Sequence, residues 1–118
     1  DGTVDMIATD HAPHTAEEKR RGARGILGLE TAFPVLYTGL VQKGILTLEA
    51  LVALLSARPR ARFEIPGDGD FSIWDLNTDS VIDPASFRSL GRSTPFEGWH
   101  VKGACLLTVC GGTPVYSI

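Results

Sequence analysis

Apolar and polar positions follow two different spacings along the chain. Residues 4–8 form a short apolar run with the length and β-branched content of a buried strand, and the run stops at Asp10. Residues 30–43 carry apolar side chains at helical spacing, with Gly44 placed to end the helix in the left-handed conformation. Residues 48–56 repeat that spacing after Thr47, a suitable N-cap. The first half is therefore predicted to contain one strand, a loop and two helices.

The spacing changes at a turn-forming cluster, Pro-Gly-Asp-Gly-Asp, at residues 66–70. Beyond it we expect a short helix at residues 83–89, begun by Asp83 as cap and Pro84 at the first helical position. The remaining apolar runs predict short strands at residues 71–76, 80–82, 99–102, 105–110 and 114–118. The pattern predicts two parts, residues 1–65 and a β-rich part at residues 66–118.

Composition excludes several classes of function. The 118 residues include 11 basic and 14 acidic side chains, and a net charge of −3 is too small to indicate nucleic-acid or membrane-surface binding. No segment reaches the roughly 20 apolar residues that span a bilayer, so we expect a cytoplasmic protein. Cys105 and Cys110 lie five apart in a predicted strand, where they would face opposite sides, so no disulfide is expected. Small neutral or acidic metabolites remain open as ligands.

The candidate chemistry lies where the first apolar run ends, in Thr-Asp-His-Ala-Pro-His at residues 9–14. Pro13 cannot donate to a strand ladder and pushes the preceding residue away from the helical region, so the chain should turn just after Asp10. A carboxylate at the carboxyl end of a buried parallel strand is a common catalytic or metal-binding group in barrel and open α/β enzymes. A surface turn with solvated imidazoles is the alternative. Gly25 and Gly28 would let backbone approach a ligand or another element closely.

Two blocks of sequence stand out. The first consists of DGTVDMIATDHAPHT at residues 1–15, EEK at 17–19 and GILGLETA at 25–32; the second consists of STPFEGW at 93–99, LLTV at 106–109 and GG at 111–112. Together they resemble the dihydroorotases of the amidohydrolase superfamily. The related hydantoinases and allantoinases usually lack the Ala-Pro-His that follows Asp-His here. The chain departs from the family at Arg24, where an aromatic residue is usual, and at Arg58, where Asn is usual.

The resemblance implies an α/β fold. Residues 1–65 would be the end of a (β/α)8 metal-dependent hydrolase barrel, with its last strand, active-site loop and helices, and residues 66–118 the C-terminal share of a small β-rich composite domain. Such a TIM barrel needs about 250 residues. The chain would then be a C-terminal fragment, completed by the remainder of its own chain or by a complementary chain. We expect the fragment alone to be inactive.

The resemblance also implies roles for individual residues. Asp10 would be a ligand of a catalytic zinc ion and the group that carries the proton, while most zinc ligands would lie upstream of this fragment. His14 would bind the carboxylate of the substrate, and Arg24 and Gly25 would lie in the region that contacts the substrate. His11 receives no role. Zinc lowers the pKa of bound water from about 15.7 to about 7, which supplies a nucleophile near neutral pH.

Three functions are compatible with the sequence. The complete protein would be a dihydroorotase that interconverts N-carbamoyl-L-aspartate and L-dihydroorotate in pyrimidine biosynthesis. It would otherwise be an inactive dihydroorotase-like partner of aspartate transcarbamoylase, or another cyclic amidase of the hydantoinase or allantoinase type. The expected partners are the small-molecule substrate, dihydroorotate or N-carbamoyl-aspartate, and the missing part of the protein. An inactive dihydroorotase-like protein would also bind aspartate transcarbamoylase. A homo-oligomer stays open.

Overall fold

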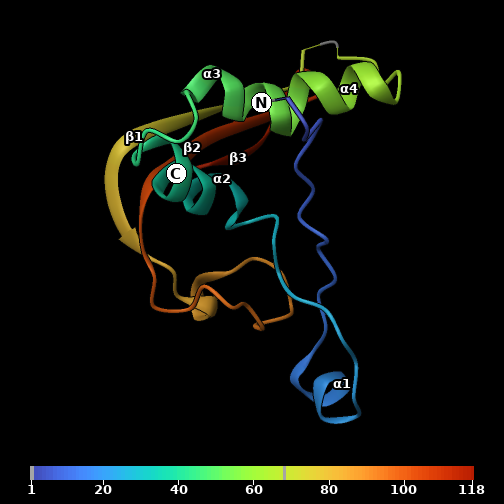
Figure 1. Cartoon of the computed structure of the whole chain (residues 1–118). Coiled ribbons are helices and arrows are strands. Elements are labelled where there is room, and N and C mark those ends of the chain that lie inside the picture. Colours follow the sequence, from blue (N-terminus) through green and yellow to red (C-terminus); the bar gives the residue numbers. More distant parts are fainter. Residues whose placement is uncertain (1, 68) are drawn as a thin grey trace.

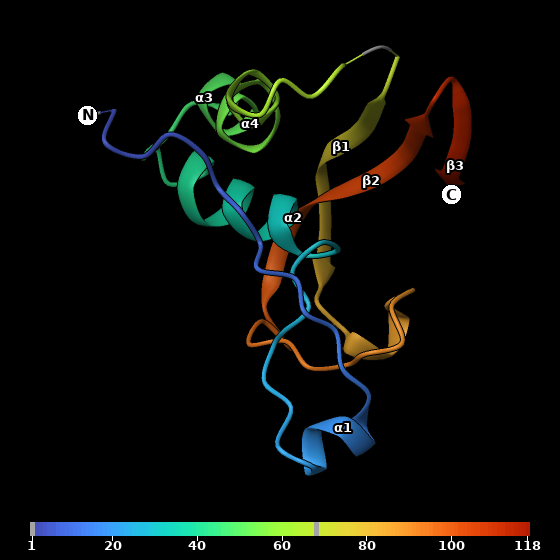
Figure 2. The same cartoon turned by 90° about the vertical axis from the view of Figure 1, so that its right-hand side faces the viewer.

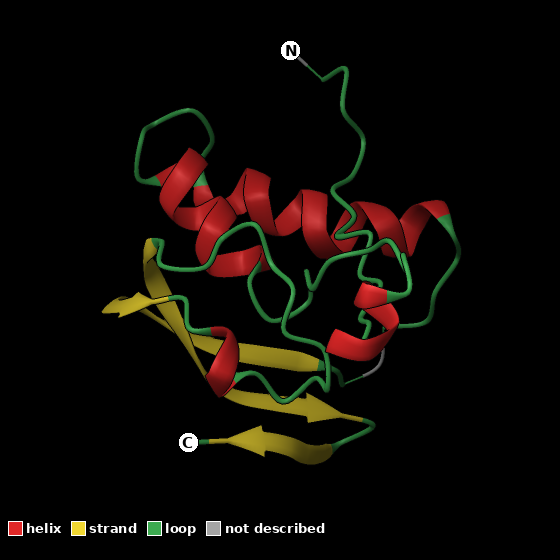
Figure 3. Cartoon of the chain, turned by 90° about the horizontal axis from the view of Figure 1, so that it is seen from below, coloured by secondary structure: helices red, strands yellow, loops and turns green. Residues whose placement is uncertain are grey.

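The computed structural model describes residues 2–67 and 69–118 (Figure 1). Helical segments lie over one face of a three-stranded antiparallel sheet, and a long loop carrying α1 (Ala16–Arg20) extends away from both (Figures 1 and 2). Figure 3 shows the two layers from below, with the helical segments of residues 32–62 on one side and the strands on the other. The fold is therefore α/β with a small antiparallel sheet.

Both predicted helices of the first half form. The first comprises α2 (Ala32–Leu36) and the π-helical η1 (Tyr37–Val41), and Gly44 follows with a φ of +69°. The second starts at Thr47, whose hydroxyl accepts a hydrogen bond from the Ala50 amide at 3.2 Å. It continues without a break beyond the predicted residue 56, through the segments α3 (Leu48–Val52), η2 (Ala53–Ala57) and α4 (Arg58–Arg62).

The buried strand predicted at residues 4–8 is wrong for this chain. The segment is extended but unpaired, and Val4 is 60% exposed. The amide of Ile7 donates to the carbonyl of Leu54 at 3.0 Å, so the segment lies beside a helix (Figure 1). A strand needs a neighbour that takes up its backbone hydrogen bonds, and the described part of the chain offers residues 4–8 no such neighbour.

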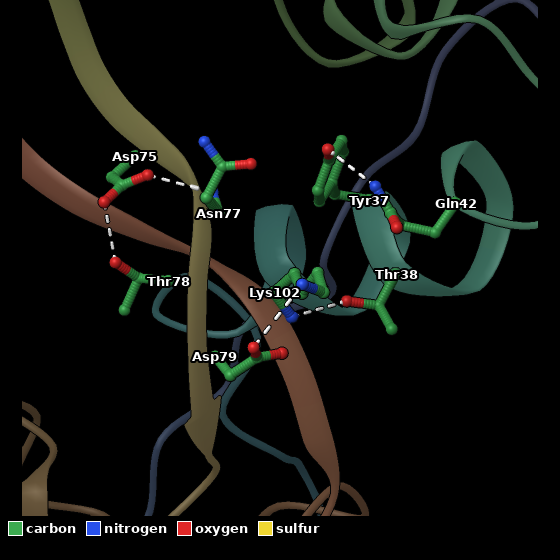
Figure 4. A network of polar contacts seen from close by, with 8 residues as sticks. All are labelled: Tyr37, Thr38, Gln42, Asp75, Asn77, Thr78, Asp79 and Lys102. Carbon is green, nitrogen blue, oxygen red and sulfur yellow. Dashed lines mark hydrogen bonds and ion pairs between the residues drawn. The ribbon is translucent and has the colours of Figure 1, made fainter.

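The second half forms the sheet, with strands in the order β1 (Phe71–Val81), β2 (His100–Cys110) and β3 (Thr113–Ser117). The strands predicted at 71–76 and 80–82 join into β1, and those predicted at 99–102 and 105–110 join into β2. The register of β1 shifts between Asp75 and Asp79. Asp75 stabilises this irregularity because its carboxylate accepts hydrogen bonds from the Asn77 amide at 2.9 Å and the Thr78 hydroxyl at 2.7 Å (Figure 4).

The helix over 83–89 is shorter than predicted. Only the 3-10 turn η3 (Pro84–Ser86) forms, and the carboxylate of Asp83 caps it by accepting a hydrogen bond from the Ala85 amide at 2.8 Å. Pro84 stands at the first position, as predicted. The turn at residues 95–98 then leads into β2, where Phe96 and Trp99 meet edge to face at 5.1 Å.

The first helix packs on the sheet at a glycine. A Cβ at Gly103 in β2 would lie 3.4 Å from the ring of Phe33, whose ring centre is 4.3 Å from that of Trp74 in β1. The hydroxyl of Thr38 accepts a hydrogen bond from the Lys102 amide at 2.8 Å, which joins η1 to β2 (Figure 4). The buried apolar core is made of Leu27, Tyr37, Leu51, Leu54, Ile82, Val101 and Val109.

The turn cluster at residues 66–70 includes Asp68, which lies outside the described residues, as does Asp1. Both cysteines are free thiols, with Cys110 exposed and Cys105 half-buried. No helix in the described ranges 2–67 and 69–118 has the length and apolar character needed to cross a membrane.

Candidate functional site

Asp10 is an exposed carboxylate on an unusual backbone. Its φ is +49°, in the left-handed region that only a few per cent of residues other than glycine adopt, although Asp is among those that tolerate it best. Its carboxylate makes no hydrogen bond or ion pair with any other described residue. Glu64 shares this conformation with a φ of +52°, and Asp10 is set apart as a candidate for function by its place after the apolar run, beside His11 and His14.

The segment that follows Asp10 is fastened to a second segment about 15 residues further on. His11 and Ile26 form an isolated parallel bridge, and the Ala12 amide donates to the Ile26 carbonyl at 2.9 Å. The Nδ1 atom of His11 accepts hydrogen bonds from the amides of Gly28 at 3.2 Å and Leu29 at 3.3 Å. Sequence reasoning gave His11 no role because these two donors belong to backbone, which leaves no residue pattern to detect.

Two glycines make this approach achievable. A Cβ at Gly25, whose φ is +139°, would lie 2.5 Å from the carbonyl oxygen of Ala12. A Cβ at Gly28 would lie 2.7 Å from the Cβ of Thr9. Both distances are too short for any side chain, so the glycines let the two backbones come together. The predicted close approach therefore exists, and in this structure it is to another segment of the chain.

His14 begins the loop that carries α1. Its Nδ1 atom lies 3.6 Å from a carboxylate oxygen of Glu18, and its side chain is 31% exposed. The same carboxylate accepts hydrogen bonds from the Thr15 amide at 2.7 Å and the Thr15 hydroxyl at 3.0 Å. The bonds from the Thr15 amide and hydroxyl, followed by the nearby imidazole, lower the pKa of Glu18 even though slight desolvation opposes them. Glu18 is thus an anion held beside His14.

The loop between α1 and Gly25 brings one cation back toward the site. Lys19 donates a hydrogen bond from Nζ to the carbonyl oxygen of Gly25, whereas Arg24 is exposed to solvent. The sequence predicts a loop between the first apolar run and the first helix, and the structure adds the short helix α1 to that loop. The arrangement of Thr15 and Glu18 is a capping box, a sequence signal by which the start of α1 could have been found.

These residues do not form a metal site by themselves. Across residues 2–67 and 69–118, no three His, Cys, Asp or Glu side chains gather closely enough to hold an ion. The described residues also form two open grooves of about 510 and 570 Å3 between the helices and the sheet, both of which include Trp74 in their walls. Asp10, His14, Arg24 and Gly25 line neither groove.

Curated relatives match almost all of the chain. The dihydroorotase of Brevibacillus brevis is 52% identical over an alignment 127 positions long, which covers 98% of this chain and 30% of that protein. The dihydroorotase of Bacillus thuringiensis is 50% identical over an alignment 123 positions long, which covers 95% of this chain and 29% of that protein. The chain therefore spans less than a third of the length of these relatives. No protein-family model matches it.

Solved structures share the fold. L-hydantoinase from Arthrobacter aurescens superimposes with a TM-score of 0.84 at 36% identity, over 96% of this chain and 29% of the enzyme. D-hydantoinase from Thermus sp. gives a TM-score of 0.88 at 23% identity, over 98% of this chain and 29% of that enzyme. An inactive dihydroorotase-like domain of a Chaetomium thermophilum CAD-like multifunctional protein gives 0.62 at 24% identity, over 75% of this chain and 25% of that chain.

Proposed function

Because this chain is a relative of the dihydroorotases over nearly its whole length, we propose that it is part of a dihydroorotase. The complete protein would interconvert N-carbamoyl-L-aspartate and L-dihydroorotate. Residues 1–65 would be the end of its (β/α)8 barrel and residues 66–118 a share of its small β domain. The extended segment at residues 4–8 supports this proposal, since it has the composition of a strand and lacks a neighbour among the described residues.

Asp10 is the residue on which the proposal depends most. Its left-handed backbone and its carboxylate, unengaged by other described residues, suit a group that must meet a reacting molecule. The carboxylate would accept a proton from the attacking water at one of its oxygens and return it to the ring nitrogen as the cyclic amide opens. A single residue would thus act first as a base and then as an acid.

The described residues could supply only part of a zinc site. The carboxylate of Asp10 is a suitable ligand, but catalytic zinc sites use about three protein ligands, and the described residues bring no such group together. The other ligands would come from the part of the relatives' length that this chain does not span. Zinc, when bound, would lower the pKa of its water and polarise the amide carbonyl.

His14 would distinguish dihydroorotate from neutral cyclic amides. Its imidazole is partly exposed and can donate a hydrogen bond to the substrate's carboxylate. Glu18 beside it is an anion that would help keep the ring oriented, with Nδ1 facing Glu18. Gly25, whose backbone lies against Ala12, and Arg24, exposed beside it, would contribute to the wall of the substrate site.

A hydantoinase activity is the second candidate, favoured by the likeness to L-hydantoinase at 36% identity. The test supplies the complete protein with L-dihydroorotate, N-carbamoyl-L-aspartate and an uncharged hydantoin. We expect turnover of the first two and little of the third. Turnover of hydantoin alone would establish the second candidate, and no turnover of any of them would favour an inactive partner, for example of aspartate transcarbamoylase.

A further inference from the structure

The hydrogen bonds of His11 define the state of its ring. Nδ1 lies 3.2 Å from the Gly28 amide nitrogen and 3.3 Å from that of Leu29. A backbone amide can only donate, so Nδ1 must accept both bonds and cannot itself carry a proton. The ring is therefore the tautomer protonated at Nε2.

The two donors belong to the turn that starts the first long helix. The carbonyl oxygen of Gly28 accepts hydrogen bonds from the Ala32 amide at 2.9 Å and the Thr31 amide at 3.3 Å. His11 thus ties the residue immediately after Asp10 to the start of α2. Ala12 adds a third bond to the neighbouring Ile26 carbonyl at 2.9 Å.

These bonds hold the chain on one side of a strained residue. Asp10 has a φ of +49°, and a side-chain-bearing residue released from its surroundings prefers a negative φ. The direction of its carboxylate depends on that φ because the side chain leaves from the same Cα. Fastening His11 and Ala12 therefore fixes the direction in which the Asp10 side chain leaves the backbone.

We infer that His11 is a positioning residue, whose Nδ1 fastens the Asp10 segment to the Gly28–Leu29 turn and so sets the position from which the Asp10 side chain extends. This rests on the proposed function of Asp10 as the group that carries the proton. His11 acts through the backbone and touches neither the substrate nor the proton in transit. The contact itself is independent of that function.

Three variants of His11 distinguish loss of the hydrogen bonds accepted by Nδ1 from loss of the imidazole ring alone. His11→Asn places its amide oxygen near the position of Nδ1 and can accept the same two bonds. His11→Gln is also a polar amide but carries its oxygen one bond farther out, so it is the matched control. His11→Ala removes the acceptor altogether.

The first readout is structural and is made on the complete protein. Nitrogen-15 NMR of histidine-labelled protein, with the His11 signals assigned by their loss in His11→Gln, should show an unprotonated Nδ1 and a protonated Nε2. Amide hydrogen exchange at residues 28 and 29 should be about fivefold or more faster in His11→Gln and His11→Ala than in wild type, and close to wild type in His11→Asn. A protonated Nδ1, or equal exchange in all four proteins, would overturn the inference.

The second readout is kinetic. A displacement near 1 Å in a reacting group costs up to about 100-fold in rate, so His11→Ala and His11→Gln should lose about 10- to 100-fold in kcat with little change in KM. His11→Asn should recover most of that loss. Equal kcat values for His11→Asn and His11→Gln would refute the positioning role. Wild-type protein that opens no cyclic amide would refute the proposed function instead, and the tautomer and exchange rates would still decide whether His11 holds the Asp10 segment.

Discussion

The carboxylate of Glu30 accepts a hydrogen bond from the backbone amide of Arg88 at 2.8 Å, although the two residues are 58 apart in sequence. The Ser89 amide donates to the other carboxylate oxygen at 3.1 Å. Partial burial acts to raise the pKa of Glu30, but the hydrogen bonds from Arg88 and Ser89, with the charge of Arg92, outweigh it and lower that pKa. Glu30 therefore joins the start of α2 to the loop that follows η3.

Replacing Glu30 should change how stability depends on pH. A carboxylate whose pKa is lower in the folded state than in the unfolded state stabilises the fold when the pH is above its unfolded-state pKa. This contribution disappears as the pH falls through the folded-state pKa. The ordinary pKa of a glutamate side chain is 4.5. We expect Glu30→Gln to reduce the free energy of unfolding by about 0.5–1 kcal/mol at pH 7, after allowance for solvent screening. The difference from wild type should shrink as the pH falls below that ordinary value.

Urea denaturation between pH 3 and pH 7 measures this difference. Glu97→Gln is the matched control, because Glu97 is an exposed glutamate on the turn before β2. It should leave the pH dependence close to that of wild type. A Glu30→Gln protein whose stability differs from wild type by the same amount at pH 3 and at pH 7 would contradict the lowered pKa of Glu30.

Substitutions at Asp10 and at His14 should have different kinetic effects in the complete protein. Asp10→Asn keeps the shape but removes the proton carrier, and loss of acid–base transfer costs about 10²–10⁴-fold in rate. His14→Ala removes a hydrogen-bond donor to the substrate's carboxylate, so KM for dihydroorotate should rise more than kcat falls. Steady-state kinetics in both directions of the reaction measure the two effects.

An uncharged cyclic amide serves as the control substrate for His14. It has no carboxylate, so its turnover should hardly respond to His14→Ala, provided that the complete protein accepts it. Near-normal turnover by Asp10→Asn would contradict the role of Asp10. A His14→Ala defect of equal size on charged and uncharged substrates would contradict the role of His14.

Gly25→Ala should be much more damaging than Gly22→Ala. Both glycines have positive φ values, +139° at Gly25 and +93° at Gly22, but a Cβ at Gly22 meets nothing within 4 Å. Gly22→Ala therefore isolates the backbone cost, about 1 kcal/mol. Gly25→Ala adds a collision with the Ala12 backbone, and we expect a total of about 2–4 kcal/mol. Equal losses of unfolding free energy would mean that the two segments part without cost.

Thr38→Val tests the bond that joins η1 to β2. Valine keeps the shape of threonine but leaves the half-buried Lys102 amide without its acceptor, which should cost about 1–2 kcal/mol. Thr113→Val, at an exposed position in β3, is the matched control and should stay within about 0.5 kcal/mol of wild type. Thermal and urea unfolding of the two variants make the comparison. Similar stability of both would contradict the importance of the Thr38 hydroxyl.

The helices could be found in the sequence because their signals are local. Thr47 caps the second helix and Gly44 follows the first, and both act within a few residues of their own positions. The strands were found as short runs, but their lengths were underestimated. Asp75 holds an irregularity inside β1 that looked like a gap, and Gly103 lies inside β2 where a break was expected.

The features of the candidate site also divide into those that the sequence determines and those that the tertiary structure determines. The sequence by itself determined that a carboxylate and two imidazoles follow an apolar run, and that glycines lie near residue 25, because these are properties of residue identity and order. Only the tertiary structure decided that residues 4–8 stay unpaired here, that Asp10 adopts a left-handed backbone, and that His11 binds the Gly28 and Leu29 amides. The physical reason is that strand pairing and backbone hydrogen bonds between distant segments depend on which neighbours the folded chain brings close, and residue order does not encode those neighbours locally.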